Sequence, residues 1–282
     1  MLNLLSKKNL SILLALLSLN TMNTSLMAWE ECCDSSTYDL SECNRIYIGA
    51  FGGEIFSNST KLSQMGTAFF TEASGGPLAV YAKGRTKKKS TGFGGVQLGY
   101  EWGQNSRCSR WNVAPAAEIE AYFYGHNKKG HLINPTDRLP EHDFADSFHM
   151  NASVCLINAV FSVRNSWCKL VPYIGGGIGA AHISIRNAKS LQVSPVEPGI
   201  NHFNSKRDDT SWAFAAQAKA GVRYNVWERF HIFAEYRYLF LGSSKYILGS
   251  TVYPTHAPTS PWDIKMNNIS CNAFSLGIQY DL

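Results

Sequence analysis

The feature that most constrains this chain is a series of eight runs in which apolar and polar residues alternate. The runs cover residues 44–57, 91–103, 111–125, 147–163, 168–185, 211–225, 229–242 and 269–282. Such alternation is typical of β-strands with two different faces, and no helical period competes with it over a comparable length. We therefore predict an all-β fold of eight antiparallel strands.

The connections between these runs alternate strictly in length. Long ones (58–90, 126–146, 186–210 and 243–268) alternate with short ones (104–110, 164–167 and 226–228). This order places every long loop at one end of the sheet, as in transmembrane barrels with long extracellular loops and short periplasmic turns. Nothing in the physics of a soluble β-sandwich requires all its long loops to lie at one end and all its short turns at the other. The pattern predicts an eight-stranded antiparallel transmembrane up-and-down β-barrel.

The two strand faces differ in a way that fits a bilayer. In the last run Phe274, Leu276 and Ile278 alternate with Ser275 and Gln279. Other polar faces carry ionised side chains, which would cost several kcal/mol each in a dry sandwich unless they were paired. In a membrane barrel the apolar face points to lipid and the polar face lines the interior.

The charged members of the polar faces form a predicted interior network. They are Glu101, Glu118, Glu120, Lys219, Arg223, Glu235 and Arg237. An eight-stranded barrel is just wide enough for such side chains to meet. Two interpretations stay open, a paired plug that satisfies the buried charges and a polar path for small solutes gated by them.

Aromatic residues near the strand ends suit the two girdles at the membrane–water interfaces. They are Tyr47, Trp102, Trp111, Tyr122, Tyr124, Trp167, Trp212, Tyr224, Trp227, Phe230 and Tyr280. Generic β-propensity of aromatic residues is the alternative explanation. Their clustering beside the turns favours the girdles.

The first 28 residues have the organisation of a secretory signal. Lys7 and Lys8 precede an apolar run of about ten residues (10–19), which is too short to span a bilayer as a helix, and Ala28 suits a cleavage site. We predict a signal peptide at 1–28, a periplasmic segment at 29–43 and a barrel at 44–282. No later apolar stretch is long enough for a transmembrane helix, so the predicted location is the outer membrane of a Gram-negative bacterium.

The net charge and the cysteine spacing exclude two further classes of function, nucleic-acid binding and a cysteine zinc site. Without Lys7 and Lys8 the 26 basic residues fall to 24 against 21 acids, a net of about +3 that is too mild to indicate nucleic acid. The cysteines match no zinc-site spacing, and an exported chain forms disulfides readily. The candidates on the periplasmic side are Cys32, Cys33, Cys43, Cys108 and Cys168, whereas Cys155 and Cys271 have no obvious partner.

Four glycine- and aromatic-rich segments carry a family resemblance. They are 47–53 (YIGAFGG), 92–100 (GFGGVQLGY), 172–179 (PYIGGGIG) and 273–282 (AFSLGIQYDL). With them the chain resembles the small outer-membrane barrels related to the OmpA membrane domain and the bacterial surface-antigen barrels. The resemblance implies contact with outer-membrane lipid and lipopolysaccharide, and insertion by the barrel-assembly machinery. That machinery reads a terminal aromatic residue in the family, where this chain has Leu282. The motifs are permissive and imply no specific activity.

The predicted extracellular loops offer two candidate sites. A basic patch of Lys83, Arg85, Lys87, Lys88 and Lys89 in the first long loop could contact lipopolysaccharide phosphates or anionic host glycans, but the favoured interpretation is a solvated mobile loop. Histidines 126, 131, 142, 149, 202 and 256 also fall in or beside these loops. Clustered histidines can bind metal or sense acid, but no pair has helical ligand spacing, so we interpret them as ordinary loop polarity.

An enzymatic interpretation rests on one motif. His182-Ile183-Ser184 resembles the His-x-Ser core of the lipid A deacylase barrels, and Glu197 follows. That family has Asn directly after the Ser, where this chain has Ile185, and its motif lies near the C-terminus. Lipid A modification therefore stays a remote alternative.

The sequence as a whole predicts a non-enzymatic outer-membrane barrel that needs no cofactor or metal. Its expected role is structural and surface-interacting: envelope integrity, and adhesin-like contact with host surface molecules through the long loops. A porin-like channel for small solutes is the main alternative.

Overall fold

A computed structural model describes residues 44–103, 111–134, 142–165 and 167–282. The predicted signal peptide and the segment 29–43 lie outside these residues, so both stay predictions. Within the described residues no helix is long and apolar enough to cross a membrane.

Eight strands form a closed antiparallel ring. They are β1 (Arg45–Ser57), β4 (Lys89–Glu101), β5 (Trp111–Ile133), β6 (Asp143–Asn165), β7 (Leu170–Ser194), β8 (Asp209–Asn225), β9 (Phe230–Leu241) and β12 (Ile269–Asp281). Each pairs with the next in this order, and β12 pairs with β1, where Tyr47 is opposite Asp281. The predicted eight-stranded barrel is confirmed, and each strand overlaps one predicted run.

The outward face of the ring is apolar, as predicted. One residue from each strand illustrates it, with exposed fractions of 44% to 64%: Ile48, Val96, Ile119, Ile157, Ile178, Phe214, Ile232 and Leu276. Such side chains would be costly in water, and together they form a lipid-facing band.

The long connections are more ordered than predicted. Two of them contain four further strands, β2 (Lys61–Ala68), β3 (Leu78–Thr86), β10 (Ser244–Leu248) and β11 (Trp262–Met266), and a 3-10 turn, η1 (Glu72–Ser74). The other two include extensions of β5, β6 and β7 beyond the predicted runs. The prediction of a mobile loop at 58–90 was therefore wrong, because β2 and β3 pair with each other and with β5 and β11.

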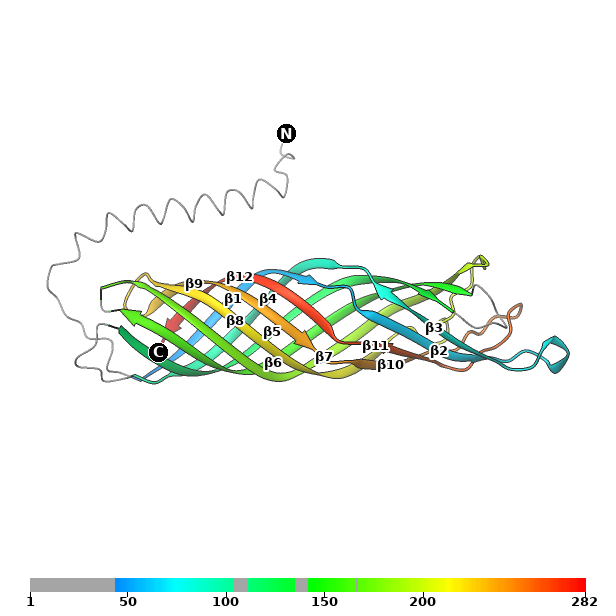
Figure 1. Cartoon of the computed structure of the whole chain (residues 1–282), viewed down its shortest axis with the longest axis horizontal. Coiled ribbons are helices and arrows are strands. Elements are labelled where there is room, and N and C mark those ends of the chain that lie inside the picture. Colours follow the sequence, from blue (N-terminus) through cyan, green and yellow to red (C-terminus); the bar gives the residue numbers. More distant parts are fainter. Residues whose placement is uncertain (1–43, 104–110, 135–141, 166) are drawn as a thin grey trace, which may run out of the picture. The chain divides into compact units, whose positions relative to one another are not determined.

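We call this additional layer the collar: β2, β3, β10 and β11 with residues 126–133 of β5, 143–150 of β6 and 186–194 of β7. Figure 1 shows the four short strands at the end of the barrel opposite to the C-terminus. The collar encloses a buried apolar group of Leu62, Phe144 and Trp262 with Phe203 of the connection between β7 and β8, each at most 2% exposed. Long connections mark the extracellular end of an outer-membrane barrel, so the collar is extracellular.

Glycines on the inward face make room for aromatic rings. A Cβ atom built on Gly99 would lie 2.1 Å from the ring of Tyr47, and one on Gly221 would lie 2.7 Å from the ring of Tyr173. Any larger residue would clash at these positions. The glycine-rich strands therefore let large interior side chains cross a narrow lumen.

The predicted aromatic girdles need a correction. Trp102, Trp111, Trp167, Trp212, Tyr224, Trp227 and Tyr280 are exposed on the outside, and Phe230 is half-buried. Tyr47, Tyr122 and Tyr124 are instead buried in the lumen. They occupy the strand positions that face inward, and position near a strand end does not override this alternation.

Candidate functional site: the filled lumen and the basic collar

Ion pairs fill the lumen at the middle of the barrel. Lys219 on β8 reaches across to β5, where its Nζ lies 2.6 Å from Oε1 of Glu120 and also contacts Glu118. Arg237 on β9 places Nη1 3.0 Å from Oε2 of Glu120 and contacts Glu235 on its own strand. All five side chains are at most 5% exposed. Buried charges persist only when they are paired, so these contacts join β5, β8 and β9 through the lumen.

Neutral groups complete this central cluster. Tyr47 donates a hydrogen bond to Glu118, and Tyr173 donates one to Glu235, each at 3.0 Å. Gln217 donates to Glu120 and, at 2.8 Å, to Asn158. Each buried carboxylate therefore has several partners, as burial in a low-dielectric interior requires.

A second charged cluster lies toward the periplasmic end. Glu101 on β4 accepts from Arg45 at 2.8 Å and from Arg223 at 3.1 Å, and it also contacts Arg164. Asp281 on β12 lies 2.6 Å from Nη1 of Arg45. These contacts connect β1, β4, β6, β8 and β12 in one network.

Taken together, the two clusters contain equal numbers of carboxylates and basic side chains. Their carboxylates are Glu101, Glu118, Glu120, Glu235 and Asp281, and their basic side chains are Arg45, Arg164, Lys219, Arg223 and Arg237. A cavity of about 10 Å³ remains among them. That volume is roughly the minimum for one water molecule, so this cavity offers no open passage between the ion pairs.

The structure brings together all seven residues of the predicted interior network. Glu101 and Arg223 lie in the periplasmic cluster and the other five in the central one. The prediction missed Arg45, Arg164 and Asp281 as members of the same network. All three lie in phase with the inward-facing residues of their strands, so extending the alternation to the strand ends would have identified them.

An aromatic layer covers the central cluster on the collar side. The guanidinium of Arg237 lies 3.9 Å from the ring centroid of Phe51 and 5.6 Å from that of Tyr122. Phe93 packs against both rings, with centroids 6.0 Å and 5.9 Å away. Cation–π contact adds stabilisation to a charge that is already paired.

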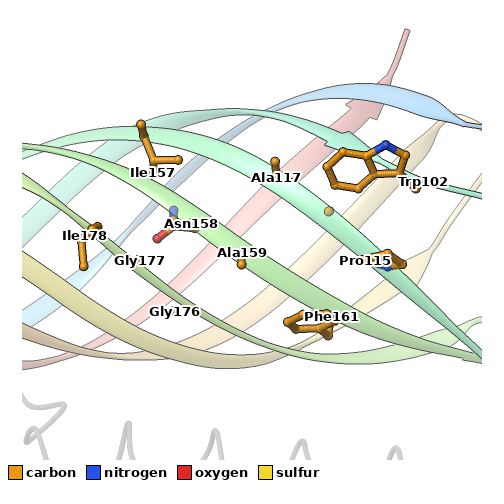
Figure 2. Close-up of a pocket in the computed structure, with 11 residues that line it drawn as sticks. Trp102, Pro115, Ala117, Ile157, Asn158, Ala159, Phe161, Gly176, Gly177 and Ile178 are labelled. Carbon is orange, nitrogen blue, oxygen red and sulfur yellow. The ribbon is translucent and has the colours of Figure 1, made fainter.

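A shallow apolar hollow lies on the outside of the barrel (Figure 2). Small residues at aligned positions of β5, β6 and β7, namely Ala117, Ala159 and Gly176, form its floor, between walls that include Ile157 and Ile178. Its volume is about 610 Å³. Because these walls belong to the lipid-facing band, hydrocarbon chains fill the hollow in a membrane.

The predicted basic patch lies on the outer face of the collar. Lys83 and Arg85 are on β3, Lys87 and Lys88 follow it, and Lys89 begins β4; all five are exposed. Nζ of Lys83 lies 4.2 Å from the ring centroid of Tyr81.

The sheet register enlarges this patch with residues far away in sequence. Lys61 on β2 is opposite Arg85, and Lys245 on β10 is opposite Lys265 on β11. We call the enlarged set the basic belt: Lys61, Lys83, Arg85, Lys87, Lys88, Lys89, Lys245 and Lys265. The four short collar strands contain a single acidic residue, Asp263. The belt is therefore a strongly positive surface.

The deacylase-like motif is not assembled as a catalytic triad. His182 and Ser184 lie on the outer face of β7, where the His182 ring packs against Trp212 at 5.0 Å. Glu197, the candidate acid, instead lies beside His202 and His256.

The cysteines are tested only in part. Cys32, Cys33, Cys43 and Cys108 lie outside the described residues, so pairing among them stays a prediction. Cys168 is a free, exposed thiol in the turn between β6 and β7. The other described cysteines are also free: Cys155 is exposed on the outer face of β6 and Cys271 is buried inside.

Residues 144–276, slightly less than half of the chain, match a family model described as surface antigen. The predicted resemblance to the surface-antigen barrels is confirmed. An uncharacterized protein of Brucella abortus is 28% identical to this chain over 151 residues, which are 51% of this chain and 50% of that protein. One of Brucella suis is 28% identical over 112 residues, 40% of this chain and 37% of that protein. The match thus spans at most half the length of these relatives.

Several solved outer-membrane proteins are similar to the barrel at low sequence identity. Neisserial surface protein A is 14% identical, with 85% of this chain and 99% of that chain covered and a TM-score of 0.34. The Escherichia coli outer-membrane protease OmpT is 11% identical, with 89% and 100% covered and a TM-score of 0.38. Yersinia pestis Ail, solved with the heparin analogue sucrose octasulfate, is 13% identical, with 82% and 99% covered and a TM-score of 0.29. Values this low carry no conclusion about function.

Proposed function

We propose that this outer-membrane barrel acts as a surface-contact protein, which binds polyanionic carbohydrate through the basic belt of its collar. The observation that carries the proposal is the belt itself. All its side chains are exposed, and six of the eight lie on paired strands. The pairing of the strands fixes the spacing of these six before a ligand arrives. A preordered array of positive charge binds phosphate or sulfate groups without the entropy cost of ordering a mobile loop.

Two sources share this ligand chemistry. Phosphates of lipopolysaccharide lie in the same membrane as the barrel, whereas sulfated glycans belong to host surfaces. Both are dense in negative charge and large enough to span several lysines. The belt is exposed on the collar strands, just outside the lipid-facing band, and both sources can reach it there.

The test is a charge reversal on one strand. Binding of the purified barrel to immobilised heparin and to lipopolysaccharide is measured for the wild type and for the double variant Lys83→Glu/Arg85→Glu. We expect the double variant to lose at least about tenfold in affinity, and wild-type binding to weaken steeply with salt because exposed charges are screened. Loss of heparin binding alone indicates a host glycan, and loss of lipopolysaccharide binding alone indicates the bacterial ligand.

The matched control changes the same charges at the other end of the barrel. Lys169 and Arg229 are exposed at the periplasmic turns. The double variant Lys169→Glu/Arg229→Glu has the same net charge as the belt variant and should bind as the wild type does. Equal losses in both variants, or no loss in either, contradict a specific role for the belt.

The channel alternative receives less support from the interior. A conducting lumen needs a continuous hydrated path, whereas ion pairs span this lumen and the cavity lined by the central cluster measures about 10 Å³. In planar bilayers we expect the wild type to give no steady conductance. Steps that change with Glu120→Gln or Arg223→Gln would favour a pore instead.

A further inference from the structure

Three potential metal ligands converge at the open end of the collar. Glu197 and His202 belong to the connection between β7 and β8, and His256 belongs to the connection between β10 and β11. One ligand atom from each lies within 4.8 Å of the other two. The cluster lies apart from the charged lumen and from the basic belt.

The distances within this cluster fit a shared ion better than direct hydrogen bonds. Nε2 of His202 lies 3.6 Å from Oε2 of Glu197, and Nε2 of His256 lies 3.4 Å from Oε1 of the same carboxylate. Both separations exceed the 2.7–3.2 Å usual for N–H···O hydrogen bonds. Ligand atoms at about 2.0–2.1 Å from a tetrahedral zinc ion are about 3.3 Å apart. The separation of each imidazole nitrogen from the Glu197 oxygen nearest to it is close to that value, and one ligand atom from each of the three residues lies within 4.8 Å of the other two.

In both histidines Nδ1 faces a backbone carbonyl oxygen, as is usual for histidines that bind a metal through Nε2. Nδ1 of His202 lies 3.1 Å from the carbonyl oxygen of Ser190, and Nδ1 of His256 contacts the carbonyl oxygen of Ala257. A carbonyl oxygen can only accept, so each Nδ1 carries the proton. In the neutral imidazole, Nε2 of each residue then keeps a free lone pair on the side of the cluster.

The surroundings fix the ligands and leave an entry path. His202 is 3% exposed and packs against Phe144, with ring centroids 5.1 Å apart. Thr251 donates a hydrogen bond to the carbonyl oxygen of His202 at 3.1 Å. Side chains of Glu197 and His256 are 31% and 14% exposed, so an ion can reach the cluster from outside.

We propose that Glu197, His202 and His256 bind a Zn²⁺ ion, with water in the fourth position. Two imidazoles and one carboxylate are a common donor set for zinc, and three protein ligands leave one position open. The bound ion would join the connection between β7 and β8 to that between β10 and β11. Zinc would thus fasten two extracellular segments that contribute to the ligand-facing end of the molecule.

Zinc titration of the purified full-length barrel in detergent micelles tests the proposal. The protein is freed of metal with EDTA, and its thiols are blocked with iodoacetamide so that cysteines do not contribute. Isothermal titration calorimetry should show one zinc ion per chain. His202→Ala and Glu197→Gln should each weaken binding by at least about 10- to 100-fold, the loss found when even a partner of a ligand is removed.

Two further variants keep the test decisive. His256→Asn changes a more exposed ligand and should weaken zinc binding to a similar extent, even if loss of the buried His202 disturbs the collar. His149→Ala removes an exposed histidine of β6 outside the cluster and should bind zinc as the wild type does. Heat-modifiable electrophoretic mobility verifies that each variant is folded.

A second readout distinguishes a metal site from an ion pair between Glu197 and protonated histidines. Co²⁺ in a site of this kind should give the visible absorption bands of tetrahedral coordination, and His256→Asn should abolish them. Absence of zinc binding in the wild type, or equal affinity in the wild type, His256→Asn and His149→Ala, would overturn the proposal.

Discussion

Lys219 is one of the two basic side chains that pair with the three carboxylates of the central cluster. It lies 4% exposed among three carboxylates, with Glu118 and Glu120 in direct contact and Nζ 3.7 Å from Oε2 of Glu235. Removing one partner of a buried ion pair costs more than the pair itself contributes, because an uncompensated charge stays behind.

Replacing Lys219 with methionine should therefore destabilise the barrel. We expect the free energy of unfolding to fall by about 3–5 kcal/mol. Urea unfolding in lipid vesicles, followed by tryptophan fluorescence, measures the change. Lys189→Met, at an exposed position of the collar, should change it by less than about 0.5 kcal/mol. Similar effects of the two variants would show that the cluster does not stabilise the fold.

Asp146 is a buried carboxyl group in the collar, outside the lipid-facing band. Burial raises the pKa of Asp146 from 3.8 to about 7, although a hydrogen bond with Ser190 opposes this. Below pH 3.8 the carboxyl is protonated in both the folded and the unfolded chain. As the pH rises toward 7, the unfolded chain ionises while the folded one keeps its proton, so the free energy of unfolding falls.

Asp146→Asn should remove this dependence on pH. The variant should gain stability relative to the wild type as the pH rises from 4 to 7, with roughly 1.4 kcal/mol expected for each unit of pKa shift. Unfolding midpoints measured across this range give the difference between the two proteins. A difference that stays constant with pH would show that Asp146 titrates normally in the folded state.

The collar is an element with its own apolar core. The ring of Trp262 on β11 is 1% exposed and lies within 6.2 Å of the ring of Phe144 and 6.5 Å of that of Phe203. Gly66 on β2 lies against the same ring, because a Cβ built there would come within 2.6 Å of it. Packing on this tryptophan holds β2, β6, β11 and the connection between β7 and β8 together.

Trp262→Ala should loosen the collar and leave the membrane ring intact. Truncating a buried aromatic residue costs about 3–5 kcal/mol. Limited proteolysis should cut the collar of the variant much faster than that of the wild type, while its heat-modifiable mobility is retained. Trp227→Ala, at a 70% exposed position of a periplasmic turn, is the matched control. Equal cleavage rates in all three proteins would argue against this packing role.

The whole molecule combines a ring that faces lipid with a collar that faces water. An exposed side chain therefore contacts lipid when it lies on the ring and water when it lies on the collar. Ile178 on β7 is 63% exposed in the lipid-facing band, and Ile247 on β10 is 55% exposed on the collar. In the bilayer an arginine at the first position loses its hydration, whereas one at the second keeps it.

Substitution by arginine should therefore reduce stability at Ile178 but not at Ile247. Ile178→Arg should cost about 2–4 kcal/mol, the range measured for arginine at the midplane of membrane barrels. Ile247→Arg should change stability little. Urea titrations of folding into lipid vesicles measure both. If Ile178→Arg were as harmless as Ile247→Arg, the outward apolar band would not face hydrocarbon.

The sequence by itself determined the eight strands, their antiparallel order and which residues face the lumen. It could do so because the alternation along a strand is a local property, repeated in every run from Arg45 to Asp281. The same alternation placed Glu120 and Lys219 inside. For Tyr47, Tyr122 and Tyr124 the prediction followed their position near strand ends, although the same alternation places their side chains in the lumen.

Only the tertiary structure decided what the long connections do. The strands β2, β3, β10 and β11 are short, and β2 and β11, which join them into one sheet, are more than 190 residues apart, so no local pattern marks them as one sheet. The convergence of Glu197, His202 and His256, and the alignment of Lys245 with Lys265, depend on this pairing. Contacts between segments distant in sequence are set by register and packing, which spacing along the chain does not encode.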